Sequence, residues 1–257
     1  MSMKTIAQQP IGIFDSGMGG ISVLKEAKKI LPNESFIYYG DGKNIPYGTK
    51  SVEILIQLSD AICKMLIDDY GVKAIVIACN TATSAAIGYL RSKYDIPIIG
   101  MEPALKPAVC ANFGGTVGVL ATEVTLREEK FRSLASLYNE QTRIIKLPAP
   151  NLVTLVERGI VNGQEAESEL LESFRGYKND LDALVLGCTH FVFLKEVILK
   201  MFKNEIDIHD GNNGTVRNLK QILTVQNKLT SALQGDIKIL NSGGQALVKQ
   251  SWSLYNL

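Results

Sequence analysis

Short apolar runs alternate with longer segments in which apolar residues recur at helical spacing. The runs are rich in β-branched residues and predict buried strands. They lie near residues 11–14, 35–39, 74–78, 96–99, 116–120, 143–147, 181–187 and 206–209, with a later one at 236–240. Residues 52–70 are typical of the helical segments between them. This alternation predicts an α/β fold built on parallel sheets.

The same layout occurs twice along the chain. Each half has a strand with a polar end, a second strand, and a third strand that ends in cysteine; Asp15 precedes Cys79 by 64 positions and Thr122 precedes Cys188 by 66. We interpret this as an internal duplication. It predicts two pseudo-symmetric lobes, each a mostly parallel sheet flanked by helices, with the active site in the cleft between them. Residues 1–102 plus 215–257 would form the first lobe and 103–214 the second.

Several segments carry more specific expectations. Residues 1–10 have no clear pattern and are expected to form a loose tail. Helices are expected at 21–30, 126–138, 164–177, 193–202 and 216–233, with a final one after the Gly243-Gly244 turn. The segment 215–257 is too short for a lobe of its own, so we expect it to pack on the first lobe.

Two cysteines follow apolar strands directly. In KAIVIACNTATSA (73–85), Cys79 ends a strand, and the polar residues after it predict the start of a helix. Cys188 has the same setting in LDALVLGCTH (181–190). Ligands bind at this edge of open α/β sheets, and a helix N-terminus favours a thiolate. A single buried cysteine is usually an inert apolar residue, but a matched pair favours two thiols facing one site.

The composition excludes several classes of protein. The net charge is +1, from 27 basic and 26 acidic residues, so no nucleic-acid partner is expected. No apolar run approaches the ~20 residues of a membrane helix, and the start of the chain lacks an apolar signal core. Four cysteines without a CxxC spacing, together with two histidines, disfavour a disulfide framework and a zinc site. We therefore expect a cytoplasmic protein that makes no membrane contact.

Two loops of the first half are candidate parts of a site. The turn DSGMGG (15–20) lacks the order of a dinucleotide fingerprint, but its glycines would allow a small ligand to approach the backbone. Asp15 and Ser16 would then either line a site or simply cap the following helix. In the irregular loop 43–50, Tyr47 would either cover a pocket or serve as a packed anchor.

Two facing thiols suit one chemistry better than the others. A redox pair usually lies within one motif, and a metal site would need more ligands than Cys79, Cys188 and His190. Inversion of a stereocentre needs a base on one face of a carbon and an acid on the other. Donors at helix N-termini would stabilise the charge that develops. Pseudo-symmetric lobes fit this task, so the pattern favours proton transfer at a carbon centre.

Five motifs together resemble a known family. GIFDSGMGG, YYGDGKNIPYG, VIACNTATSA, LVERG and VLGCTHF are similar to motifs of the bacterial glutamate racemases, in the cofactor-independent aspartate/glutamate racemase superfamily. The resemblance covers about residues 11–190. It implies interconversion of L- and D-glutamate without pyridoxal phosphate or metal, which supplies D-glutamate for peptidoglycan. It also implies that Cys79 and Cys188 are the acid/base residues.

The resemblance assigns further residues by position. Asp15 and His190 would be the partners of the two thiols, while Glu157 and Asp41 receive no definite role. The remaining matches would surround the substrate: Asp15, Ser16, Tyr47, Gly48, Asn80, Thr81, Thr122, Thr189 and His190. We expect glutamate as the small-molecule partner, no cofactor and a homodimer.

The chain departs from the family pattern in its second half. Ala121 replaces the usual glycine before Thr122, Val192 replaces a proline, and residues 209–213 (HDGNN) lack the usual D-S-G or D-S-A form. These departures leave the cysteines intact but leave the substrate open. A racemase of aspartate or another small amino acid remains an alternative, as does a two-lobed protein that binds an amino acid without chemistry.

Overall fold

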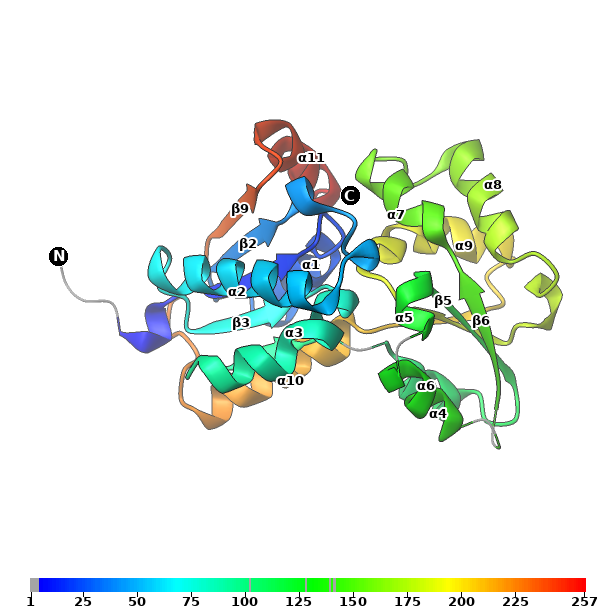
Figure 1. Cartoon of the computed structure of the whole chain (residues 1–257), viewed down its shortest axis with the longest axis horizontal. Coiled ribbons are helices and arrows are strands. Elements are labelled where there is room, and N and C mark those ends of the chain that lie inside the picture. Colours follow the sequence, from blue (N-terminus) through cyan, green and yellow to red (C-terminus); the bar gives the residue numbers. More distant parts are fainter. Residues whose placement is uncertain (1–4, 102, 128, 139, 141) are drawn as a thin grey trace. The chain divides into compact units, whose positions relative to one another are not determined.

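The structure, a computed structural model, describes residues 5–101, 103–127, 129–138, 140 and 142–257. The chain divides into two compact units, Met1–Met101 with Asn212–Leu257, and Glu102–Gly211. Each unit contains one parallel sheet (Figure 1). None of the helices in the described ranges is both long and apolar enough to span a bilayer.

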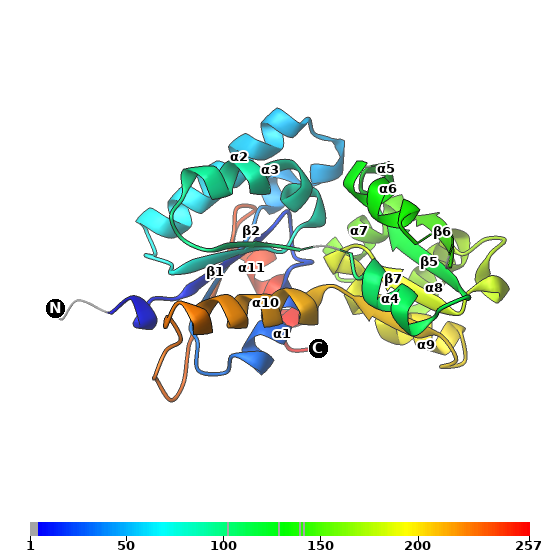
Figure 2. The ribbon, with the colours of Figure 1, turned by 90° about the horizontal axis from the view of Figure 1, so that it is seen from below.

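The first unit has a five-stranded sheet in the order β4-β3-β1-β2-β9. Its strands are β1 (Ile11–Asp15), β2 (Phe36–Gly40), β3 (Ala74–Ile77), β4 (Ile98–Gly100) and β9 (Ile237–Asn241). Its helices are α1 (Ile21–Ile30), α2 (Val52–Asp68), α3 (Asn80–Lys93), α10 (Asn212–Val225) and α11 (Gln245–Tyr255), with short 3-10 turns η1 (Ile6–Gln8), η2 (Gly42–Asn44) and η3 (Tyr47–Thr49). Helices α2 and α3 cover one face, and α1 and α10 cover the other (Figure 2). The C-terminal segment thus completes the first unit.

The second unit has a four-stranded sheet in the order β6-β5-β7-β8. Its strands are β5 (Thr116–Ala121), β6 (Arg143–Pro148), β7 (Ala183–Leu186) and β8 (Asp207–Asp210). Its helices are α4 (Leu105–Ala111), α5 (Glu123–Arg127), α6 (Glu129–Ser136), α7 (Pro150–Glu157), α8 (Gly163–Ser173) and α9 (Lys195–Met201), with 3-10 turns η4 (Lys178–Asp180) and η5 (Thr189–Leu194). Helices α4, α5 and α6 share a core with β5 and β7, while α7 and α9 pack with η5, and α8 packs with α7 and α9.

The two sheets repeat one strand order. The order β4-β3-β1-β2 in the first matches β8-β7-β5-β6 in the second, which agrees with the duplication inferred from the sequence. Phe14 pairs with Ile77 two positions before Cys79, and Leu120 pairs with Leu186 two positions before Cys188. The residue after Leu120, Ala121, is therefore the counterpart of Asp15. The pairing of Asp15 with Thr122 from spacing was wrong by one position, because chain spacing includes unequal loops. Thr122 corresponds to Ser16.

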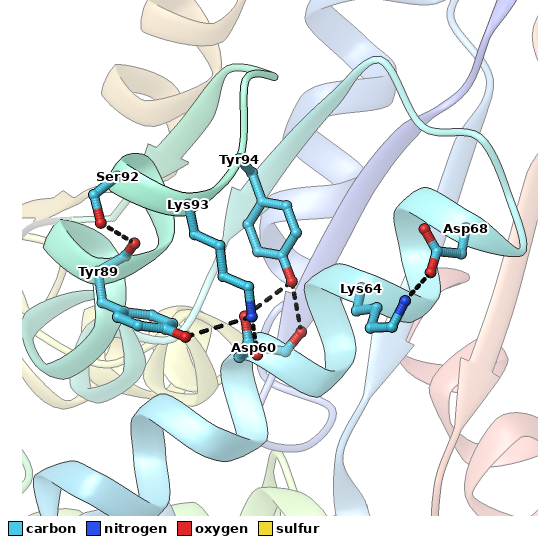
Figure 3. Close-up of polar contacts among 7 residues, drawn as sticks. All are labelled: Asp60, Lys64, Asp68, Tyr89, Ser92, Lys93 and Tyr94. Atoms are coloured by element: carbon cyan, nitrogen blue, oxygen red, sulfur yellow. Dashed lines mark hydrogen bonds and ion pairs between the residues drawn. The ribbon is translucent and has the colours of Figure 1, made fainter.

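The helix that follows Cys79 is fixed against its neighbour. Asp60 of α2 accepts hydrogen bonds from Lys93 Nζ (2.7 Å) and Tyr94 Oη (2.8 Å) at the far end of α3, as Figure 3 shows. Cys63 of α2 is fully buried in the apolar cluster that also contains Ala86 and Leu90 of α3. Burial raises the pKa of this thiol to about 12, and the nearby Asp60 charge adds to the effect. Cys63 is therefore a core residue.

Some elements differ from the sequence predictions. The expected helix at 216–233 is α10, which ends at Val225 because Asn227 has a positive φ of 53° and Thr230 N–H donates to Glu34 Oε1. The expected helices at 126–138 and 193–202 are each replaced by two shorter elements, α5 with α6 and η5 with α9. The short α4, with Pro107 in its first turn, was not predicted.

The N-terminal segment was expected to be loose. Residues 1–4 lie outside the described part, but Ile6–Gln8 forms η1, and the Ala7 carbonyl accepts a hydrogen bond from Lys73 Nζ at 2.6 Å. A buried lysine therefore ties this segment to the start of β3, which the sequence pattern gave no reason to expect.

Candidate active site

Cys79 caps the N-terminus of helix α3 with its own side chain. It lies two residues beyond β3 with extended backbone (φ −81°, ψ 121°), and its Sγ accepts a hydrogen bond from Ala82 N–H at 3.4 Å. The prediction that a helix starts directly after the cysteine is confirmed, and the cysteine itself is the N-cap. The sulfur lies where the helix dipole and exposed N–H groups favour negative charge. Asn80 and Thr81 begin the helix, with Thr81 buried.

Asp15 lies at the end of the neighbouring strand β1 and is fully buried. Its Oδ2 accepts a hydrogen bond from Gly20 N–H at 2.9 Å, so it does cap α1. The contact depends on glycine at position 20, since a Cβ there would lie 2.7 Å from Asp15 Cβ and 2.9 Å from Ala78 Cβ. Ser16, the next residue in the turn, is also buried.

Tyr47 connects this region to the loop after β2. Its Oη donates to Asp41 Oδ2 at 2.7 Å, and the ring packs in the same apolar cluster as Cys79. Burial raises the pKa of Tyr47 far above its usual value, and the hydrogen bond and charge of Asp41 and the charges of Cys79 and Asp15 raise it further. The phenol is therefore neutral and close to both Cys79 and Asp15. Tyr47 is held in place by this packing and by Asp41, while Gly48 beside it is partly exposed.

Cys188 has a different local structure from Cys79. It lies two residues beyond β7 with extended backbone (φ −141°, ψ 137°), but it precedes the 3-10 turn η5 and its side chain forms no cap hydrogen bond. Cys188 is partly exposed, whereas Thr189 and His190 behind it are buried. The two cysteines thus share a strand-end position but differ in the groups that contact the sulfur.

His190 links Cys188 to Glu157. Its Nδ1 lies 3.6 Å from Cys188 Sγ, and its Nε2 lies 2.6 Å from Glu157 Oε1. Burial acts to lower the pKa of His190, but the hydrogen bonds and charges of Cys188 and Glu157 outweigh it and raise the pKa well above the usual value. A protonated imidazole at this place puts a positive charge beside Cys188 Sγ. Glu157, the last residue of α7, thereby gains a definite contact that the sequence did not assign.

The departures in the second unit have structural explanations in part. A Cβ at Gly187 would lie 2.8 Å from Ala121 Cβ, so the alanine at position 121 is accommodated by glycine opposite it. Thr122 Oγ1 lies 3.1 Å from Thr125 Oγ1 and accepts a weak hydrogen bond from Thr125 N–H at the start of α5. Val192 lies partly buried within η5. Nothing in the structure explains why valine replaces proline there.

Residues 209–213 carry the chain from the second unit into the first. His209 Nε2 lies 2.7 Å from Oδ2 of Asp207, the first residue of β8. Asn213 Nδ2 then donates to Glu26 Oε1 at 2.6 Å at the start of α10. The departure from the family form therefore falls on a connecting segment.

The structure groups the candidate residues within each unit. Asp15, Tyr47 and Asp41 gather near Cys79 in the first, and His190 and Glu157 near Cys188 in the second. Over the residues that the structure describes, no group of three or more His, Cys, Asp and Glu side chains is arranged to hold a metal ion.

The chain is similar to known proteins over nearly its full length. The profile of the Asp/Glu/Hydantoin racemase family matches residues 21–218. A glutamate racemase of Clostridium botulinum is 50% identical over 239 residues, which cover 92% of each chain. The structure of Escherichia coli glutamate racemase with L-glutamate and the activator UDP-MurNAc-Ala has a TM-score of 0.86 at 29% identity, covering 96% of this chain and 94% of that one. That of Francisella tularensis with D-glutamate has a TM-score of 0.80 at 30% identity, covering 98% and 95%.

A profile match over most of the chain and a half-identical relative over nearly all of it define the class of enzyme. The chain belongs to the Asp/Glu/hydantoin racemase family and, within it, to the glutamate racemases. The resemblance drawn from the five motifs is confirmed, and so is the α/β fold with two parallel sheets. Membership makes the protein an isomerase.

Proposed function

We propose that this protein interconverts L- and D-glutamate by proton transfer at the α-carbon, with Cys79 and Cys188 as the two acid/base groups. The observation that carries the proposal is the matched position of the thiols, each two residues beyond the equivalent strand, β3 or β7. Solved relatives contain each enantiomer, D-glutamate in one and L-glutamate in another. The proposal requires the two thiols to reach opposite faces of one α-carbon during catalysis.

The proposed reaction consists of two proton transfers, one on each face of the α-carbon. From L-glutamate, the Cys188 thiolate takes the α-proton, and the C–H electron pair stays on the α-carbon. The Cys79 thiol then gives its proton to the opposite face, which yields D-glutamate and leaves a thiolate at Cys79. The reaction from D-glutamate runs the other way. The α3 N-terminus favours negative charge on the Cys79 sulfur, and protonated His190 places a positive charge beside the Cys188 sulfur.

The remaining candidates are proposed to bind the substrate. Asp15 would orient the Cys79 side of the reaction, and His190 would do so for Cys188. The groups proposed to contact glutamate are Ser16, Tyr47, Gly48, Asn80, Thr81, Thr122 and Thr189. Backbone N–H groups at the start of α3 suit the negative charge that develops as the proton leaves. No cofactor takes part in this proposal.

The wider role follows from the product. D-glutamate would be supplied for peptidoglycan synthesis, with the enzyme acting in the cytoplasm as a homodimer. The dimer is tested by light scattering with sedimentation equilibrium, where a molecular mass near that of one chain would contradict it.

The direct test follows the circular dichroism of L- and D-glutamate, with aspartate measured in parallel. We expect Cys79→Ala and Cys188→Ala each to abolish racemisation while glutamate still binds. Cys110→Ala is the matched control, since Cys110 is exposed on α4. Exchange of the α-proton in heavy water separates an enzyme from a protein that only binds glutamate. Full racemisation with either Cys79 or Cys188 missing would contradict the two-thiol proposal, and a faster reaction of aspartate would reassign the substrate.

A further inference from the structure

A turn near the C-terminus contacts the loop that carries Tyr47. Ser242 lies directly after β9, and its Oγ donates a hydrogen bond to Asp41 Oδ1 at 2.7 Å. The same Oγ accepts from Lys43 N–H at 2.9 Å, and Ser242 N–H donates to the Gly40 carbonyl at 2.9 Å. One serine thus makes three hydrogen bonds to a loop about two hundred positions earlier in the chain.

Asp41 connects Ser242 to Tyr47, because its carboxylate accepts a hydrogen bond from each. Its carboxylate is buried and accepts hydrogen bonds from Ser242 on Oδ1, from Tyr47 Oη on Oδ2, and from Asn44 Nδ2 on both oxygens at 3.0 Å. Asp41 N–H donates to the Asp15 carbonyl at 2.9 Å. A buried carboxylate needs its full set of donors, and each donor restricts its rotation. The carboxylate orientation that receives Tyr47 is therefore set in part by Ser242.

Two glycines of the loop allow close backbone packing beside this contact. A Cβ at Gly40 would lie 2.5 Å from the Gly17 carbonyl oxygen and 2.8 Å from Asn241 Nδ2. A Cβ at Gly42 would lie 2.7 Å from Asn241 Oδ1 and 2.6 Å from Leu247 Cδ1. Both glycines therefore allow the end of β9 and the turn at Ser242 to lie close to the loop that carries Asp41.

We propose that Ser242 is a positioning residue for substrate binding, which acts through Asp41 to hold Tyr47 beside Cys79. This inference rests on the proposed function, because it takes Tyr47 as a group that contacts glutamate. Without the Ser242 hydroxyl, Asp41 Oδ1 keeps only its bond from Asn44, and the carboxylate gains freedom to turn away from Tyr47. Tyr47 takes no part in the proton transfers, so the loss should fall on substrate binding. Ser242 also lies beyond the motifs of the first 190 residues.

The test compares steady-state kinetics of glutamate racemisation in three variants. We expect Ser242→Ala to raise KM on the order of tenfold, as loss of one hydrogen bond to a charged group predicts, with kcat changed less than about threefold. Ser242→Thr retains the hydroxyl and should restore KM to within about twofold. Ser253→Ala is the matched control, because Ser253 is exposed on α11 and its Oγ donates only to the Lys249 carbonyl. It should leave both constants unchanged.

A double-mutant cycle tests the route through Tyr47. If Ser242 acts through Tyr47, Ser242→Ala should change KM less than about twofold in a Tyr47→Phe background. An unchanged KM in Ser242→Ala, additive effects in the cycle, or parallel loss of kcat and thermal stability that threonine does not restore would each overturn the inference. A wild-type protein without glutamate racemisation would instead overturn the proposed function and this inference with it.

Discussion

Nε2 of His190 lies 2.6 Å from Oε1 of Glu157, and both side chains are largely buried. The other ring nitrogen, Nδ1, faces Cys188 Sγ at 3.6 Å. The carboxylate therefore holds the imidazole in one orientation and stabilises its protonated form. On the other side, Cys79 Sγ accepts a hydrogen bond from a backbone N–H, and Asp15 and Tyr47 lie near it. The two proposed bases thus differ in electrostatic setting despite their matched strand-end positions.

Glu157→Gln should lower the pKa of His190, because it removes the negative charge that favours the imidazolium. NMR titration of the histidine ring measures this shift directly. With fewer protonated imidazoles, less positive charge would lie beside Cys188 Sγ. We expect kcat from L-glutamate to fall on the order of tenfold for each unit by which the His190 pKa drops below the assay pH. Glu165→Gln is the control, since Glu165 forms an exposed pair with Arg158.

The same pair predicts a pH dependence of stability. The pKa of His190 is raised in the folded protein relative to about 6.5 in the unfolded chain. The resulting stabilisation is fully present below that unfolded value and is lost as the pH rises through the folded value. The free energy of unfolding of the wild type should therefore exceed that of Glu157→Gln most at low pH. A difference that grows as the pH rises would contradict this assignment.

Glycine 20 should be required for the position of Asp15. A Cβ there would approach Asp15 Cβ and Ala78 Cβ within 3 Å, so Gly20→Ala should displace the buried carboxylate. We expect a loss of about 1–3 kcal/mol in the free energy of unfolding, together with lower kcat. Gly88 in the middle of α3 is exposed and has no atom within 4 Å of an added Cβ. Gly88→Ala should stabilise the protein by about 0.5–1 kcal/mol without affecting kcat. Urea unfolding and initial rates distinguish the two.

Strands and cysteine positions were predictable because both depend on local pattern. A four-residue apolar run such as Ala74–Ile77 is typical of a buried strand in a parallel sheet. A cysteine two residues after the run then lies at the edge of the sheet where ligands bind. The contacts of His190 with Glu157, 33 positions apart, and of Ser242 with Asp41, 201 positions apart, were not predictable. They depend on how α7 packs on η5 and on the placement of β9 beside β2. No local sequence pattern encodes either of these two contacts.

Lys73 should be essential for stability but not for catalysis. Its fully buried ammonium contacts Glu34 Oε2 at 2.6 Å and the Ala7 carbonyl. Lys73→Met would leave the Glu34 carboxylate buried without its countercharge, so we expect a loss of about 3–5 kcal/mol in the free energy of unfolding. A double variant, Lys73→Met with Glu34→Gln, should recover part of it. Lys64→Met, which removes an exposed lysine paired with Asp68, should have no measurable effect. A Lys73→Met protein as stable as the wild type in urea would contradict the prediction.

The different settings of the two thiols predict that each serves one enantiomer. By resemblance to the family, Cys79 takes the α-proton from D-glutamate and Cys188 takes it from L-glutamate. A serine hydroxyl ionises far less readily than a cysteine thiol, so serine supplies almost no ionised base near neutral pH, but it fills nearly the same space. Cys79→Ser should therefore slow α-deuterium exchange from D-glutamate more than from L-glutamate in heavy water, and Cys188→Ser should do the reverse.

The exchange experiment also separates the assignment from the mechanism. A variant that retains one thiol can still remove the proton on its own face, and solvent deuterium then returns to that face without inversion. Exchange should thus persist for one enantiomer in each variant while racemisation is lost in both. Equal loss of exchange from both enantiomers in both variants would defeat the assignment of thiols to enantiomers, yet it would leave the two-thiol mechanism standing. Persistent exchange with the opposite preference would reverse the roles, and Cys188 with His190 and Glu157 would then serve D-glutamate.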